Sequence, residues 1–332
     1  MIRILAAFVG LLIVSATPAA ENTAEFSPLG VSVKAIQLTP HVYYVQGDSG
    51  AVSRANEGFN SNAGFVVTPE GVVVFDALGS PSLGQELIRV IRRITDAPIR
   101  KVVISHYHAD HMYGLQAFEK LGVEIWAQRN TMPYLASDAP KERLVERRNS
   151  LAPWVNARTH VVAPDRLVDE EDSFTLGGFT FRLFRVGPAH TSEDLAMLVE
   201  EEGVLFIGDL IFAGRIPFVG DADSRAWLTA IERLSKFNPR IMVGGHGPPS
   251  RQASEDLALT SDYLLFLRKA MGEAVDEGTF FAEAYAAMDW SRFASLPAFE
   301  AANKRNAYNT YLLMEREALA GETGVRRDTE RP

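Results

Sequence analysis

Cysteine is absent from this chain of 332 residues. Its absence excludes disulfide bonds, a lipoprotein attachment site and a thiolate that could act as nucleophile or metal ligand. Positive charge is also scarce, because 33 Lys and Arg stand against 42 Asp and Glu, a formal net charge of −9. Proteins that follow a phosphate backbone carry a basic surface, so we expect no nucleic-acid partner. Because there is no cysteine, any metal must be held by histidine and carboxylate groups.

A long apolar run occurs at the N-terminus. Arg3 is followed by an apolar stretch from Ile4 to Ala16 and then by the small residues ATPAA. The run is too short to span a bilayer comfortably, and this order is typical of a cleaved secretory signal. We therefore expect residues 1–20 to be a signal peptide, a periplasmic location, and membrane contact only before cleavage. A membrane anchor is the alternative, although no Lys or Arg closely follows the run as a stop-transfer signal.

Strand and helix patterns alternate through the rest of the chain. The first series predicts strands at 42–47, 63–68, 71–77, 101–106 and 123–128, and helices at 82–95 and 113–122. A charged stretch, 137–154, is expected to be helical. The second series has strand-rich stretches at 174–187, 195–209 and 240–247, with a helix at 224–236. This repeated order predicts two sheet-plus-helix halves packed face to face with the helices outside.

Three of the seven histidines lie in one short segment, SHYHADHMYG, at 105–114. Clustering imidazoles and a carboxylate is costly unless a cation organises them. His106 and His108 stand two apart on an extended segment and can point the same way, whereas Asp110 and His111 fall where the chain turns into a helix. This spacing supplies ligands for two metal ions. Other candidates, His190, Asp209 and His246, also lie at the ends of predicted strands, where side chains from several loops can converge.

The segment HYHADH, followed by PAHT, GD and GHG, resembles the metallo-β-lactamase superfamily, from about Thr39 to Gly247. The resemblance implies an α+β fold, a four-layer αββα sandwich, with two divalent ions, zinc, at one edge of the paired sheets. It assigns His106, His108 and His190 to one ion, Asp110, His111 and His246 to the other, and Asp209 to both. It also implies that Asp110 is catalytic, orienting the nucleophile or taking up its proton.

The N-terminal apolar run, the resemblance and the helical C-terminal pattern together predict a domain layout. We expect a signal peptide at 1–20, an N-terminal extension at 21–38, the metallo-β-lactamase-like domain at 39–250, C-terminal helices packed on it at 251–319, and a polar tail at 320–332. The segments NEGFNSNAGF, GRIPFVGDADSRAWL and NAYNTYLLMERE resemble a narrower, exported branch: SoxH-like proteins and the quinoprotein relay system zinc metallohydrolases. That branch implies a link to periplasmic sulfur or quinoprotein metabolism.

The chemistry implied is hydrolysis of an acyl bond. Two ions that share a bridging hydroxide supply a nucleophile near neutral pH and a Lewis acid for the substrate carbonyl. A thioester, lactam or lactone-like bond of a small molecule is the expected substrate, and the sequence leaves any protein partner unknown. Two alternatives remain open: a mononuclear iron oxygenase of the persulfide-dioxygenase kind, and a non-catalytic accessory protein that keeps the fold.

Three further residues are candidates for substrate contact. Arg215, in the segment AGRIPF, could pair with a substrate carboxylate through two hydrogen bonds, or it could form a structural salt bridge. Asn60 and Asn62 could line the pocket or form turns. His41 and His160 match no motif position, and we expect both to be structural or surface residues.

Overall fold

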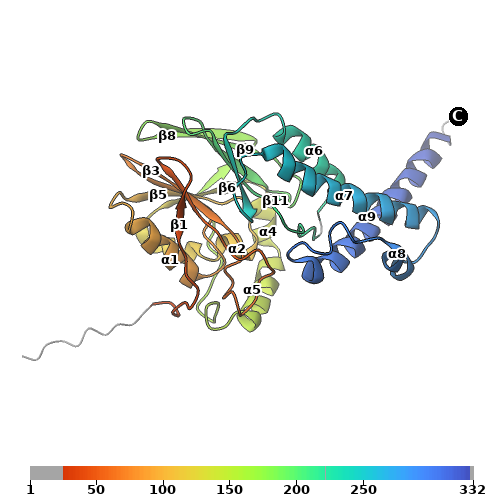
Figure 1. Cartoon of the computed structure of the whole chain (residues 1–332), viewed down its shortest axis with the longest axis horizontal. Coiled ribbons are helices and arrows are strands. Elements are labelled where there is room, and N and C mark those ends of the chain that lie inside the picture. Colours follow the sequence, from red (N-terminus) through yellow and green to blue (C-terminus); the bar gives the residue numbers. More distant parts are fainter. Residues whose placement is uncertain (1–24, 221, 330–332) are drawn as a thin grey trace, which may run out of the picture.

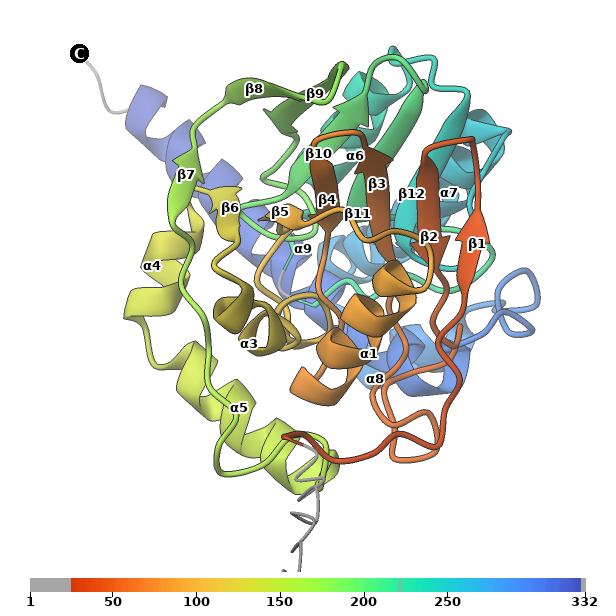
Figure 2. The same cartoon turned by 90° about the vertical axis from the view of Figure 1, so that its left-hand side faces the viewer.

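Two β-sheets form the centre of the molecule (Figure 1, Figure 2). The computed structural model describes residues 25–220 and 222–329, so the expected signal peptide at 1–20 lies outside the described residues. The seven-stranded sheet runs in the order β1 (Ala35–Gln37), β2 (Val42–Val45), β3 (Ala63–Thr68), β4 (Gly71–Phe75), β5 (Ile99–Val103), β6 (Glu124–Gln128) and β7 (Arg166–Val168). Its pairings are antiparallel from β1 to β4 and parallel from β4 to β7.

The second sheet has five strands in the order β12 (Ile241–His246), β11 (Val204–Phe212), β10 (Leu195–Val199), β9 (Phe179–Arg185) and β8 (Glu171–Leu176). Only the β11–β12 pairing is parallel within this sheet. The strand-rich stretches predicted at 174–187 and 195–209 each fold as two antiparallel strands. Gly177, Gly178 and Gly203 form the connections with positive φ, a conformation that glycine adopts without strain.

The sheets pack face to face through apolar side chains. Strands β4 and β11 are buried along their whole length, which explains why GVVVF and VLFIGDLIF lack the alternation of a half-exposed strand. Gly64 permits close approach of the sheets, because a Cβ atom there would lie 2.0 Å from the Phe206 ring. Phe206 in turn stacks on Phe75, with ring centroids 5.4 Å apart.

Helices cover the outer faces and complete four layers. Helix α1 (Pro81–Arg92) packs on the first sheet, beginning where the Ser80 hydroxyl accepts a hydrogen bond from the Leu83 amide. Helix α6 (Ser224–Leu234) covers the second sheet, capped by Asp223 and anchored by the buried Trp227. Figure 1 shows α1 and α6 on opposite sides of the paired sheets. The fold is the predicted αββα sandwich.

Several elements differ in detail from the sequence prediction. The helix expected at 113–122 is a short α3 (Leu115–Phe118) that continues as the 3₁₀ turn η1 (Glu119–Leu121) and ends at Gly122 with φ of 63°. The charged stretch forms α5 (Ala139–Ser150), as expected, but α4 (Thr131–Ala136) before it was not predicted. The three-residue strands β1 and β7 were also missed, because such short segments carry no periodic signal.

The C-terminal part is helical and packs on the second sheet. It comprises α7 (Ala253–Asp276), α8 (Phe281–Ala287) and α9 (Phe299–Thr329). The boundary expected at 319 falls inside α9. Across the described residues, none of the helices has both the length and the apolar character needed to cross a membrane.

Buried asparagine side chains join α9 to the segment that follows β11. Asn306 donates to the Pro217 carbonyl (2.7 Å) and to the Tyr263 hydroxyl (3.1 Å), and it accepts from the Val219 amide (2.9 Å). Asn306 is fully buried. Because each of its polar atoms satisfies a buried partner, this side chain fixes residues 217–219 against α9.

We predict that Asn306→Leu destabilises the protein, because it leaves the Val219 amide and the Pro217 carbonyl without their buried partners. The expected loss is about 1–3 kcal/mol of unfolding free energy, measured by urea denaturation. Arg316→Leu, at an exposed position of the same helix, is the matched control and should change stability by less than about 0.5 kcal/mol. Equal unfolding midpoints for the two variants would contradict the role given to Asn306.

Candidate metal centre

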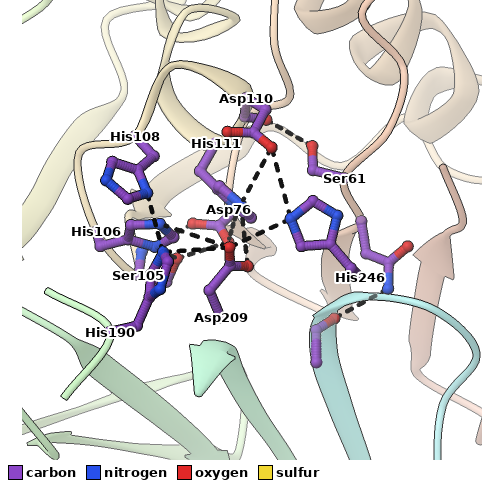
Figure 3. A network of polar contacts seen from close by, with 12 residues as sticks. Ser61, Asp76, Ser105, His106, His108, Asp110, His111, His190, Asp209 and His246 are labelled. Atoms are coloured by element: carbon purple, nitrogen blue, oxygen red, sulfur yellow. Dashed lines mark hydrogen bonds and ion pairs between the residues drawn. The ribbon is translucent and has the colours of Figure 1, made fainter. Parts of the chain in front are cut away.

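The predicted ligands meet at one edge of the paired sheets (Figure 3). His106 and His108 follow β5, and Asp110 and His111 lie in the short helix α2 (Ala109–Met112). The second sheet supplies the others: His190 from the β9–β10 connection, Asp209 from within β11, and His246 from the end of β12. Residues far apart in sequence thus converge at one edge, most of them from strand ends; Asp209 was expected at a strand end but lies inside β11, which continues to Phe212.

The converging side chains form two clusters. His106, His108, His190 and Asp209 make one, and Asp110, His111 and His246 make the other, with potential ligand atoms within 4.8 Å of one another in each. Asp209 reaches both, since its Oδ2 lies 3.5 Å from His190 Nε2 and 3.2 Å from His246 Nε2. Two such clusters are consistent with a dinuclear metal site, and the division coincides with the one that the resemblance implied.

Buried acceptors orient the imidazole rings. His111 Nδ1 lies 2.9 Å from Asp76 Oδ2, and His246 Nδ1 lies 2.6 Å from the Asn60 carbonyl oxygen. A carbonyl and an ionised carboxylate only accept hydrogen bonds, so both histidines carry their proton on Nδ1. In the neutral form of each ring, the Nε2 lone pair then faces the centre, which is the usual arrangement of a metal-binding histidine.

Several atoms that face the centre are buried without a hydrogen-bond partner in the described part of the chain. They include His106 Nε2 and His111 Nε2. Buried polar atoms are paired in the great majority of cases, so a group of unpaired ones pointing at the same interior space calls for a partner. Nitrogen and carboxylate oxygen donors that lack protons suit a divalent cation. The residues present therefore fit two metal ions.

The protonation states of the first cluster agree with metal binding. Burial lowers the pKa of His108 to about 3 and that of His190 to about 4, and it lowers the pKa of His106 well below its ordinary value. These imidazoles are consequently neutral near pH 7. The neutral form is the one that coordinates a metal.

His111 differs from its neighbours because carboxylates surround it. Burial opposes its protonation, but the negative charges of Asp209, Asp110 and Asp76 outweigh that effect and raise its pKa. His111 Nε2 lies 3.2 Å from Asp209 Oδ1. Several carboxylates thus share one buried space, and their charge requires compensation by a proton or by cations.

Asp76, which the sequence analysis did not identify, holds two ligand-bearing segments together. Its carboxylate accepts hydrogen bonds from the Ser105 amide and the Ser105 hydroxyl, each at 2.8 Å, in addition to the contact with His111. Ser105 Oγ in turn lies 3.0 Å from His106 Nδ1. The sequence signal was weak: an acidic residue directly follows the wholly apolar strand GVVVF, a position that can be buried and paired or can lead into an exposed loop.

A cavity of about 110 Å³ opens beside the ligands, and it receives two of the three predicted substrate residues, Asn60 and Arg215. Asn60 Nδ2 donates to Asp110 Oδ2 at 3.0 Å and so orients that carboxylate. Arg215 Nη1 lies 3.2 Å from His246 Nδ1. Because that nitrogen donates to the Asn60 carbonyl, the contact with Arg215 is not a hydrogen bond.

The remaining predicted residues lie elsewhere. Asn62 is not part of the cavity lining, because its amide donates to the Gly244 and Gly247 carbonyls at 2.9 and 2.7 Å. It thereby ties β3 to the loop around His246. His41 and His160 belong to neither cluster, and they pair with Glu202 and Glu119 at 2.6 and 2.9 Å.

The sequence matches the family model of the metallo-beta-lactamase superfamily over residues 56–246, more than half of the chain. A linear primary-alkylsulfatase of Pseudomonas is 24% identical over 239 residues, which cover 61% of this chain and 45% of the sulfatase. This chain therefore spans less than half of that relative. A hydroxyacylglutathione hydrolase, GloC, of Haemophilus influenzae is 28% identical over 172 residues, 49% of this chain and 77% of that protein.

Solved structures share the fold. A metallo-beta-lactamase from Pontibacter korlensis superposes with a TM-score of 0.58 at 21% identity, covering 70% of this chain and 99% of that one. The sec-alkylsulfatase Pisa1 from Pseudomonas gives a TM-score of 0.66 at 17% identity, covering 84% of this chain and 50% of that one. The family match, over more than half of the chain, shows that this chain belongs to the metallo-β-lactamase superfamily.

Proposed function

We propose that the chain is a dinuclear zinc hydrolase that cleaves an acyl bond, a thioester, lactam or lactone, in a small molecule. The observation that carries this proposal is the pair of His and Asp clusters joined by Asp209. Imidazole and carboxylate donors without cysteine suit zinc. Two of the relatives are named as a hydroxyacylglutathione hydrolase and a metallo-beta-lactamase, which supports acyl chemistry.

When bound, two ions supply an activated hydroxide and a Lewis acid at neutral pH. The protein contributes Asp110, whose carboxylate lines the cavity and is held by the Asn60 amide. Asp110 Oδ2 also lies 3.5 Å from His246 Nε2. From this position the carboxylate can take up the proton of the attacking water and transfer it to the leaving group.

The second cluster favours this reaction over a mononuclear iron oxygenase. A site of the oxygenase type needs two histidines and one carboxylate around a single ion. Here Asp110, His111 and His246 form a complete additional set, and His111 Nε2 is buried without a hydrogen-bond partner among the described residues. A mononuclear site would leave this second set without an ion, which favours two metals over one.

We also propose export to the periplasm and a role in sulfur or quinoprotein metabolism, in the manner of the SoxH-like branch. The apolar run after Arg3 with its small-residue cleavage site supports export. The segments GRIPFVGDADSRAWL and NAYNTYLLMERE support the branch. The net charge of −9 and the small cavity favour a small-molecule substrate over a nucleic acid.

The first test is metal content. We predict about two zinc ions per chain by inductively coupled plasma mass spectrometry. Removing them with a chelator should abolish hydrolysis of a generic thioester or lactam, and adding zinc back should restore it. One iron ion per chain together with persulfide-dependent oxygen uptake would show that the oxygenase alternative is correct.

A second test separates the two carboxylates. Asp209→Asn replaces a charged ligand shared by both clusters with a weakly coordinating amide, and Asp110→Asn removes one ligand and the proton acceptor. Each should lower turnover at least about a hundredfold. Asp110→Asn should also lower the metal content toward one while the melting temperature shows that the protein stays folded. Asp138→Asn, at an exposed carboxylate just before α5, is the control, and full activity of Asp110→Asn would contradict the assignment.

A third test addresses export. After expression of the full chain in a Gram-negative host, the periplasmic fraction should contain a protein that begins near Glu21, as determined by intact mass and N-terminal sequencing. Deleting residues 1–20 should retain the protein in the cytoplasm. An uncleaved chain in the membrane pellet would support the anchor alternative instead.

A further inference from the structure

Three arginines line the cavity beside the metal clusters. Arg143 and Arg147 come from α5, and Arg215 comes from the segment after β11. Arg143 and Arg147 stand four positions apart and therefore share one face of the helix. None of the three is needed to hold metal ions, which repel cations. Their presence next to the ligands requires another explanation.

The positive charge of α5 is incompletely balanced at the cavity. Arg147 is 13% exposed and lies 3.4 Å from the carboxylate of Glu146, which is itself 53% exposed. Arg143 uses the same carboxylate, at 3.1 Å. One exposed carboxylate therefore serves two guanidinium groups. An ion pair that faces solvent in this way contributes little, so it leaves both arginines available to a ligand.

Arg215 carries a positive charge that no ion pair balances among the described residues. It is only 4% exposed, and its hydrogen bonds go to the Gly50 and Ile216 carbonyls at 3.3 and 3.4 Å. Among the described residues no carboxylate forms an ion pair with its guanidinium group, so the structural salt bridge considered from the sequence is not formed; Asp209, Asp110 and Asp48 attract it only from longer range. The carboxylates of Asp110 and Asp209 are also the ones that metal ions would occupy, so Arg215 has no paired anion of its own and could bind one that arrives with a ligand.

The rest of the cavity lining includes an apolar set with small side chains. Ala301 and Ala302 in the first turn of α9, and Ala298 just before it, belong to this set together with Phe218 and Val52. Alanines leave room for a ligand, and the aromatic ring gives that ligand an apolar contact. A compound that matches this cavity has an anionic group and a short apolar part.

We propose that the substrate carries an oxyanion group, a carboxylate or a sulfate, that Arg143, Arg147 and Arg215 bind while its apolar part contacts the start of α9. This inference rests on the proposed function, because the cavity that would bind the oxyanion is the one beside the proposed metal site. Guanidinium groups bind carboxylates and sulfates through paired, charge-assisted hydrogen bonds. The anion has two possible sources: a carboxylate beside the scissile acyl bond, or a sulfate ester that is itself the reacting group. A relative named as an alkylsulfatase makes the second source worth testing.

A binding experiment that does not depend on turnover tests the anion site. The zinc-loaded protein is titrated calorimetrically with butanesulfonate and, separately, with the neutral butanamide. We expect saturable binding of butanesulfonate and at least about tenfold weaker binding of butanamide. Arg147→Gln should weaken butanesulfonate binding about tenfold or more, and Arg147→Lys should restore part of the loss because it keeps the charge.

Lys141→Gln removes one positive charge from an exposed position of the same helix, and we expect it to bind butanesulfonate like the parent. Zinc content and melting temperature are measured for every variant. Arg143→Gln provides a second variant in case Arg147→Gln does not fold. Equal butanesulfonate affinity in the parent and in a folded arginine variant would overturn the anion site.

Hydrolysis assays then separate the anion site from the reaction. The substrates are S-acetyl-3-mercaptopropionate, its methyl ester, and butyl sulfate. A preference in kcat/KM for the free acid that Arg147→Gln abolishes supports a carboxylate beside the acyl bond. Cleavage of butyl sulfate alone, impaired in the same variant, supports the anion site but overturns the acyl reaction. Equal cleavage of the acid and its ester overturns the anion site and leaves the acyl reaction intact.

Discussion

The site depends on one buried carboxylate that belongs to neither metal cluster. Asp76 accepts hydrogen bonds from the amide and hydroxyl of Ser105 and from the ring of His111. It thereby fixes the segment after β5 at two points, six residues apart, on either side of the turn that carries His108 and Asp110. The positive φ of Asp76, 65°, departs from ordinary strand geometry and directs its carboxylate to this place. Without Asp76, the His111 ring would lose the acceptor that orients it, and Ser105, which contacts His106 Nδ1, would lose its partner.

Close backbone approach is the second requirement of such a centre. A Cβ atom at Gly245 would lie 2.1 Å from Asp209 Oδ1, and one at Gly208 would lie 2.6 Å from the side chain of Ser105. Only glycine leaves room for the ligands at these positions. The two sheets can approach each other here because glycine, which has no side chain, precedes both Asp209 and His246. The glycines of VLFIGD and IMVGGHG are explained by packing around the ligands.

The sequence predicted a structural feature where its pattern occupied a few consecutive residues. Strands such as β3 and β4 were predicted from apolar runs, and the ligands of 106–111 were predicted from their spacing, because both patterns occupy a few consecutive residues. The role of Asp76 was not predicted because its partners are 29 and 35 residues away in the sequence.

Arg143 and Arg147 were not predicted for another reason. They stand among the other charged residues of 137–154, and only the tertiary packing shows which of these residues line the cavity. Asn62 was considered for the pocket, yet its neighbours along the chain could not show that two carbonyls of the 244–247 loop would take its amide.

The family match ends at residue 246, so the helices α7 to α9 lie beyond it. The matched part provides the metal ligands, which explains why the reaction class can be inferred from it. The part beyond contributes Ala298, Ala301 and Ala302 to the cavity, and Asn306 holds residues 217–219 next to Arg215. Phe218, between those two anchored residues, is thereby placed in the cavity wall. The C-terminal helices consequently shape what can approach the metal centre, and selectivity for a substrate should change with α9 while the chemistry stays with the two sheets.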